Sequence, residues 1–91
     1  MAAQAPSVLV SDVRNAIAFQ AGVDVSRVMN NAKLTDDLGL MTASIRALAI
    51  PFEDIADEYA SAVITRDAAG GCATVLDCID LVATKAGFLK Q

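Results

Sequence analysis

Apolar residues recur every three or four positions in three separate stretches of this chain, and no other feature constrains its fold as strongly. The spacing predicts helices over residues 10–21, from Ala43 or Ser44 through Tyr59, and over 75–86. No stretch shows the alternation typical of a strand, and no internal repeat is present. The predicted fold is therefore a small all-α bundle of three main helices plus a short helical turn.

Residues that start or stop helices support these bounds. Ser11 is the expected N-cap of the first helix, and Gly22 follows its last turn, where a left-handed residue commonly ends a helix. Thr74, with Asp77 three residues later, predicts a capping box at the start of the last helix, which Gly87 ends. One domain over 10–87 follows, with a flexible lead-in (1–9) and a short tail (88–91).

The two connections between these helices differ in character. Residues 22–43 combine turn formers with apolar residues, and we expect a long structured loop that buries Val28, Leu34 and Leu38. Ser26 could cap one short helical turn inside this loop. The second connection, Arg66 to Gly71, is small and flexible in composition, and we interpret Gly70–Gly71 as a hinge.

Pro51 lies inside the middle amphipathic segment and cannot donate a helical hydrogen bond. In a helix interior it would cost about 3 kcal/mol. Two arrangements remain open at this point. Either one helix kinks at Pro51, or a new helix starts with Pro51 in its first turn, where the missing N–H has no helical partner to lose.

The composition excludes several classes of function. Seven basic and eleven acidic residues give a net charge of −4, which disfavours nucleic-acid binding and favours a partner with a basic face. The absence of histidine removes the commonest general base and metal ligand, so we do not expect an enzyme. No run of about 18 apolar residues is present, and the first residues lack a basic, apolar secretory leader. We therefore expect a cytoplasmic protein without a membrane span. No large exposed apolar patch is predicted, so we expect a monomer.

Neither the cysteines nor the loop acids predict a metal site. Cys72 and Cys78 lie six residues apart, a spacing that points side chains of one helix in different directions, so two small reduced thiols are expected. Asp24, Asp36 and Asp37 lack the alternating oxygen ligands and the bidentate glutamate of a calcium loop. We expect Asp36 and Asp37 to serve the turn and to cap helices.

Five short motifs follow one another along the chain: Gly22–Val23, Val28, Asn30–Asn31–Ala32, Asp36–Asp37–Leu38–Gly39 and Ala73–Thr74–Val75. In this order they resemble the acyl carrier protein family, over roughly residues 10–86. The resemblance implies the family's helical fold and a protein that is itself no enzyme. Such a protein holds acyl, or aminoacyl or peptidyl, intermediates as thioesters on phosphopantetheine for fatty acid, polyketide or related biosynthesis.

The family's Asp-Ser-Leu motif, whose serine carries phosphopantetheine, is degenerate here. Counted without a gap, Met41–Thr42–Ala43 takes its place, whereas two extra loop residues put Ser44 in the place of the serine. The family has apolar residues one and four places after the serine. Ile45 and Leu48 stand there for Ser44, but Thr42 would require burial of an unpaired Arg46, which is costly.

Ser44 is therefore the predicted attachment residue for phosphopantetheine, and Thr42 is the less favoured one. A hydroxyl at a helix start suits a phosphodiester, because free N–H groups and the helix dipole stabilise an anion there. Ala43 stands where the family has the aspartate that helps the modifying transferase engage. The alternative for Ser44 is an N-cap with no modification.

Four acids follow on the polar face of the middle segment, with no basic residue among them. By the resemblance they would dock on basic patches of a phosphopantetheinyl transferase and of acyl-processing enzymes, and the alternative is a solvated polar face. The sequence also allows a carrier-like interaction module without a prosthetic group, or an unrelated helical bundle. The predicted partner-binding residues are Glu53, Asp54, Asp57 and Glu58.

Overall fold

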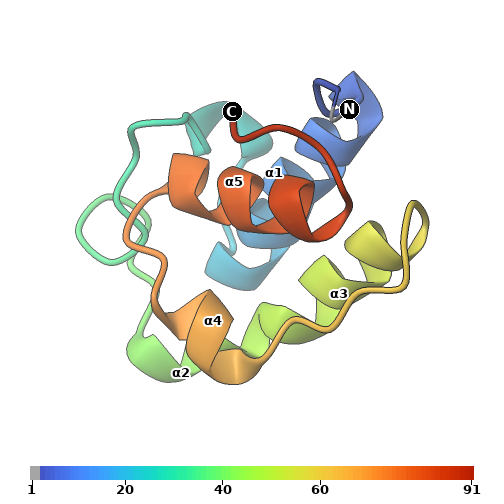
Figure 1. Ribbon diagram of the computed structural model, residues 1–91. Helices are drawn as coiled ribbons and strands as arrows, with labels where there is room; N and C mark the ends of the chain where they lie inside the picture. Colours follow the sequence, from blue (N-terminus) through green and yellow to red (C-terminus); the bar gives the residue numbers. More distant parts are fainter. Residues whose placement is uncertain (1–2) are drawn as a thin grey trace.

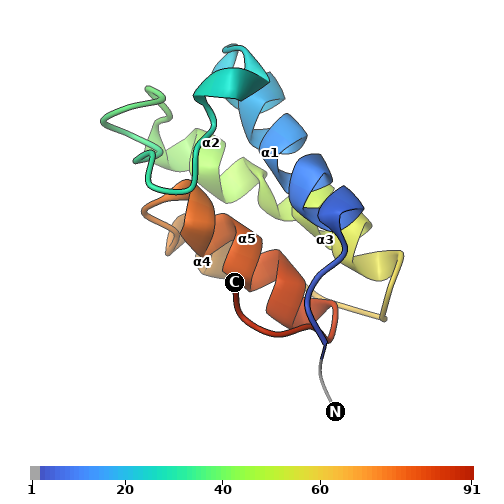
Figure 2. The ribbon, with the colours of Figure 1, turned by 90° about the horizontal axis from the view of Figure 1, so that it is seen from above.

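The computed structural model describes residues 3–91, and within that range the chain is an all-α bundle. Helices α1, α3 and α5 pack on one another, while the shorter α2 and α4 pack together at one end beside the long loop (Figures 1 and 2). The elements are α1 (Ser7–Ala21), the 3-10 turn η1 (Val25–Arg27), α2 (Thr42–Ala47), α3 (Ala49–Asp57), α4 (Arg66–Gly70) and α5 (Val75–Lys85).

The core lies where the apolar stripes of the three longer helices meet. Phe52 of α3 is fully buried, and it is the largest side chain with no exposed surface. No charged or polar residue among residues 3–91 is buried, so the interior is entirely apolar. The other fully or almost fully buried large side chains are Leu9, Val13, Ile17, Val28, Leu34, Leu48, Val75, Cys78, Ile79 and Val82.

The helix ends confirm part of the sequence-based interpretation. Gly22 ends α1 in the left-handed conformation, with φ of 69°. Thr74 and Asp77 form the predicted capping box, in which each side chain accepts a hydrogen bond from the other residue's backbone N–H. The N-cap of α1 was predicted wrongly. The helix begins at Ser7 after Pro6, and Ser11 lies exposed within the helix, because three more residues of lead-in continue the apolar stripe through Leu9.

Pro51 occupies the third position of α3, which confirms the second of the two arrangements. Helices α2 and α3 meet at Leu48, whose φ of −62° and ψ of −16° keep it close to helical geometry. Because Pro51 lies in the first turn of α3, the N–H that proline lacks has no carbonyl partner inside that helix. The predicted middle segment is therefore a bent pair of helices with a break before the proline.

The expected hinge at Gly70–Gly71 is wrong, because Gly70 is the last residue of α4. The Thr65 hydroxyl oxygen caps this helix by accepting a hydrogen bond from the Ala68 N–H at 3.1 Å. Gly70 also lies against α2, where an added Cβ would stand 2.9 Å from Arg46 Cγ. Glycine at this position lets α4 pack closely against α2. The sequence did not indicate α4 because five residues are too few for a periodic pattern to show.

The long loop is anchored to the helical bundle at two places. Arg14 of α1 donates hydrogen bonds to the Val28 carbonyl oxygen, at 2.6 Å, and to the Asn30 side chain. Farther along, the Leu34 N–H bonds the Ala73 carbonyl oxygen at 3.0 Å, just before α5. Asp24, not Ser26, caps η1: its carboxylate accepts a hydrogen bond from the Ser26 N–H. Val28, Leu34 and Leu38 are buried, as predicted.

Candidate functional site

The start of α2 determines how the two candidate hydroxyls lie. The helix begins at Thr42, before the predicted start at Ala43 or Ser44. Its N-cap is Met41, in extended conformation with ψ of 162°, and no side chain caps the helix. Ser44 is the third helical residue, so the alternative that it is the N-cap is wrong.

The two hydroxyls differ in exposure and surroundings. Thr42 is exposed and lines two adjacent open pockets, whereas Ser44 is half-buried and lines neither of them. The larger pocket, of about 360 Å³, lies between the long loop, α2 and the connection from α4 to α5. Its lining residues are Lys33, Thr35, Asp36, Thr42, Ile45, Gly70, Cys72, Ala73 and Thr74.

Attachment at Thr42 was disfavoured because it was expected to bury an unpaired Arg46, and the structure shows that Arg46 is neither buried nor unpaired. Its side chain is 42% exposed, and its guanidinium forms an ion pair with Asp67 of α4 at 2.7 Å. The residue four places after Thr42 is therefore neither buried nor unpaired. An exposed pair of this kind contributes at most about 1 kcal/mol, and its main consequence is to dock α2 on α4 at the edge of the pocket.

The four acids of α3 are not equivalent. Asp54 and Glu58 are exposed, and Glu53 is half-buried. Asp57 has a structural role, because one carboxylate oxygen accepts a hydrogen bond from the Ala62 N–H at 3.1 Å and so holds the turn after α3. Ile50, which is 59% exposed, lies one turn before Asp54 on the same face. This face therefore presents an apolar side chain followed by carboxylates.

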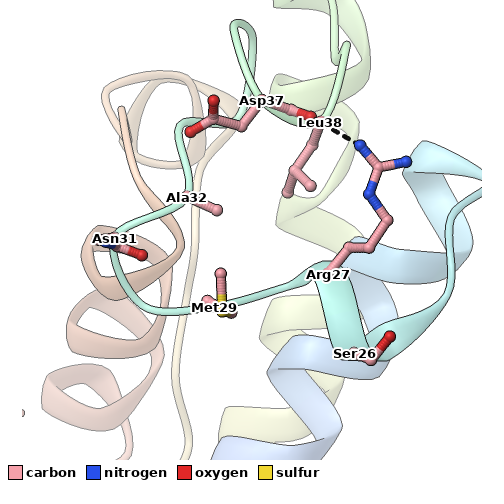
Figure 3. A pocket seen from close by; sticks show the side chains of 7 residues that line it. All are labelled: Ser26, Arg27, Met29, Asn31, Ala32, Asp37 and Leu38. Atoms are coloured by element: carbon pink, nitrogen blue, oxygen red, sulfur yellow. Dashed lines mark hydrogen bonds between the residues drawn. The ribbon is translucent and has the colours of Figure 1, made fainter.

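A further pocket, of about 440 Å³, lies between η1 and the long loop, and the sequence did not indicate it (Figure 3). Arg27 reaches across it and donates a hydrogen bond to the Asp37 carbonyl oxygen at 3.3 Å. The Asp37 carboxylate instead accepts a hydrogen bond from the Lys33 N–H at 2.7 Å, which matches the turn role expected for it. The pocket thus combines one guanidinium with the apolar side chains of Met29 and Leu38.

The two cysteines lie on different elements of the fold. Cys72 lies in the connection before α5 and Cys78 lies within α5, so the rule for two positions on one helix does not apply. Both are free and buried. The neighbouring Cys78 thiol lowers the pKa of Cys72, and the same interaction together with burial raises the pKa of Cys78.

No family model matches the chain. Between residues 3 and 91, no helix is long and apolar enough to cross a membrane. The same residues contain no group of three or more histidine, cysteine, aspartate or glutamate side chains placed to hold a metal ion.

Proposed function

We propose that this chain is a carrier protein of the acyl carrier kind, with phosphopantetheine attached to a hydroxyl in the first turn of α2. The observation that carries the proposal is the position of that turn. It presents two hydroxyls at the end of the bundle, beside an open pocket of about 360 Å³. The order of elements supports it, since a long loop precedes the bent pair α2–α3 and a short α4 precedes the last helix, α5.

The residues present fit such a prosthetic group. Attachment requires a hydroxyl that a transferase can reach, and Thr42 is exposed while Ser44 keeps part of its surface in solvent. The pocket beside Thr42 is lined by Ile45 and Cys72 on its apolar side and by Lys33 and Asp36 on its polar side. When attached, phosphopantetheine would supply a thiol on a flexible arm for acyl transfer. The role of this chain's residues is to hold and present that arm.

The test is enzymatic loading followed by intact-mass measurement. Purified protein is incubated with coenzyme A and a broad-specificity phosphopantetheinyl transferase, with an established carrier protein as the positive control. We expect a gain of one phosphopantetheine that Ser44→Ala abolishes and the matched variant Thr42→Val retains. If Thr42→Val abolishes the gain and Ser44→Ala retains it, the chain is still a carrier and the attachment residue is Thr42. No gain, while the control protein is loaded, would refute the carrier function.

A second function, a docking module without a prosthetic group, is favoured by one observation. The first turn of α2 contains no acidic residue, so the carboxylate that helps a transferase engage is missing there. The face formed by Ile50, Asp54 and Glu58 would then be the whole functional surface. It suits a partner with an apolar contact ringed by basic groups, because opposite charges speed encounter and set specificity.

Charge reversal on α3 tests whether this surface docks the transferase. Asp54→Lys is the informative variant, because Asp54 is exposed and Asp57 also holds a backbone N–H. Asp12→Lys, on α1, is the matched control with the same change in net charge. With the transferase as the partner, we expect Asp54→Lys to weaken association, and the loss to shrink at high salt. Equal effects of the two variants would contradict docking through α3.

A further inference from the structure

The pocket between η1 and the long loop has an apolar floor and well-anchored walls. Leu38 and Ala32 line it although they are only 5% and 6% exposed, so they form its floor. On the η1 side, Arg14 of α1 donates a hydrogen bond to the Val28 carbonyl oxygen. On the opposite side, the Leu38 N–H bonds the Lys33 carbonyl oxygen at 3.2 Å. The pocket is therefore formed by the fold itself, as small-molecule sites usually are.

Arg27 places a positive charge on this pocket that no carboxylate neutralises. A guanidinium carries several N–H donors, yet within residues 3–91 the Arg27 side chain makes one hydrogen bond, to the Asp37 carbonyl oxygen at 3.3 Å. The Asp37 carboxylate points away from the guanidinium and bonds the Lys33 N–H instead (Figure 3). Arg27 forms no ion pair with any carboxylate of the described chain. Its charge and most of its donors are therefore available to a ligand.

The groups that line the pocket select one class of small molecule. A planar guanidinium pairs best with an oxyanion that accepts two parallel N–H bonds, and a carboxylate does so. A single charge fits better than a double one, because Asp37 also lines the pocket and would repel a dianion. Met29, which is 58% exposed, and Leu38 offer apolar contact to a hydrocarbon body. A volume of about 440 Å³ is near the lower end for ligand sites, so that body is short.

We propose that this pocket binds a small monocarboxylate with a short apolar body. The Arg27 guanidinium pairs with the carboxylate, and the apolar body lies against Met29 and Leu38. The proposal is independent of the carrier function, because neither Thr42 nor Ser44 lines this pocket. A ligand bound in this way bridges η1 and the part of the long loop that precedes α2.

Titration of the full chain with hexanoate at low salt, followed by amide NMR spectra, tests the site. We expect saturable shifts confined to residues 26–38, with a Kd in the millimolar range, because the ion pair is exposed. Acetate has the carboxylate without the apolar body and should bind at least about tenfold more weakly. Hexanol has the body without the charge and should also bind more weakly. Absence of saturable shifts at millimolar hexanoate, or equal binding of hexanol or acetate, would overturn the proposal.

Variants at two arginines assign the charge. Arg27→Gln should weaken hexanoate binding at least about tenfold, whereas the matched control Arg66→Gln should leave it unchanged. Arg66 is exposed on α4 and does not line the pocket, and both variants change the net charge equally. Arg27→Lys keeps the charge without the planar fork, so its affinity should lie between wild type and Arg27→Gln. Equal hexanoate affinity of the two glutamine variants, both folded by circular dichroism, would refute the role of Arg27.

Discussion

The carboxylate of Asp77 offers the sharpest test of how this fold holds its last helix. One of its oxygens accepts hydrogen bonds from the Ala73 N–H at 2.9 Å and the Thr74 N–H at 3.1 Å. In return the Thr74 hydroxyl oxygen accepts one from the Asp77 N–H at 3.2 Å. Asp77→Asn keeps the shape of the side chain and removes its charge, so it isolates the charge-assisted part of these contacts.

The expected loss follows from the exposure of the group. Hydrogen bonds to charged groups contribute about 1.5–3 kcal/mol in partly buried settings, but Asp77 is exposed, so the range for helix caps applies. We expect Asp77→Asn to lower the free energy of unfolding by about 1 kcal/mol at neutral pH. For a domain of this size that corresponds to roughly 4–8 °C in Tm. Urea unfolding measures the free energy and thermal unfolding measures Tm, each followed by circular dichroism.

The pH dependence has a definite sign. The two backbone N–H groups of Ala73 and Thr74 lower the pKa of Asp77 in the folded state. The contribution of Asp77 to the free energy of unfolding is therefore fully present above the pKa of the unfolded state, about 3.9. It is lost as pH falls through the pKa of the folded state. The stability difference between wild type and Asp77→Asn should be constant from about pH 5 to 7 and should shrink below about pH 4.

Two results would refute this reasoning. One is an Asp77→Asn variant as stable as wild type at pH 7, and the other is a stability difference that persists unchanged at pH values well below 3. Asp54→Asn is the matched control, since Asp54 is an exposed acid on α3. Its effect should stay within about 0.5 kcal/mol.

Three further changes test the packing and the backbone, each by urea unfolding. Phe52→Ala removes the largest fully buried side chain, so we expect a loss of about 3–5 kcal/mol, and a loss below 1 kcal/mol would contradict its central place. Gly39 has φ of 72° with nothing within 4 Å of an added Cβ, so Gly39→Ala should cost about 1 kcal/mol through backbone strain alone. Phe19 is 90% exposed, so Phe19→Gln should change stability by less than about 0.5 kcal/mol.

The parts of the fold that the sequence predicted are those that local chemistry determines. The capping box at Thr74 and the left-handed Gly22 need only neighbouring residues, so their sequence signals carry over to the structure. Pro51 restricted the middle segment to two arrangements for the same reason. α4 was missed, because a five-residue helix of mostly small side chains shows no periodicity, and its stability comes from packing against α2 and α3.

The candidate site was harder to predict because two of its features depend on contacts between distant segments. Arg46 finds its partner, Asp67, 21 residues along the chain, and no local pattern announces that ion pair. Cys72 and Cys78 are near in sequence, but the extended backbone at Thr74 places Cys72 outside α5, where the spacing rule for one helix does not apply. In both cases the prediction used the spacing of residues within one helix, although the residues concerned lie on two different elements.

The preference for Ser44 over Thr42 depended on one premise that the structure contradicts. Ser44 was preferred because an apolar residue was required four places after the attachment point, and Arg46 stands there for Thr42. The ion pair with Asp67 lets a charged residue occupy that position at the surface, since α4 supplies the opposite charge and Gly70 leaves room for the Arg46 side chain. Periodicity therefore no longer separates the two candidates. Exposure and the pocket favour Thr42, whereas the primary hydroxyl that attachment chemistry normally uses belongs to Ser44, which is why the loading experiment pairs Ser44→Ala with Thr42→Val.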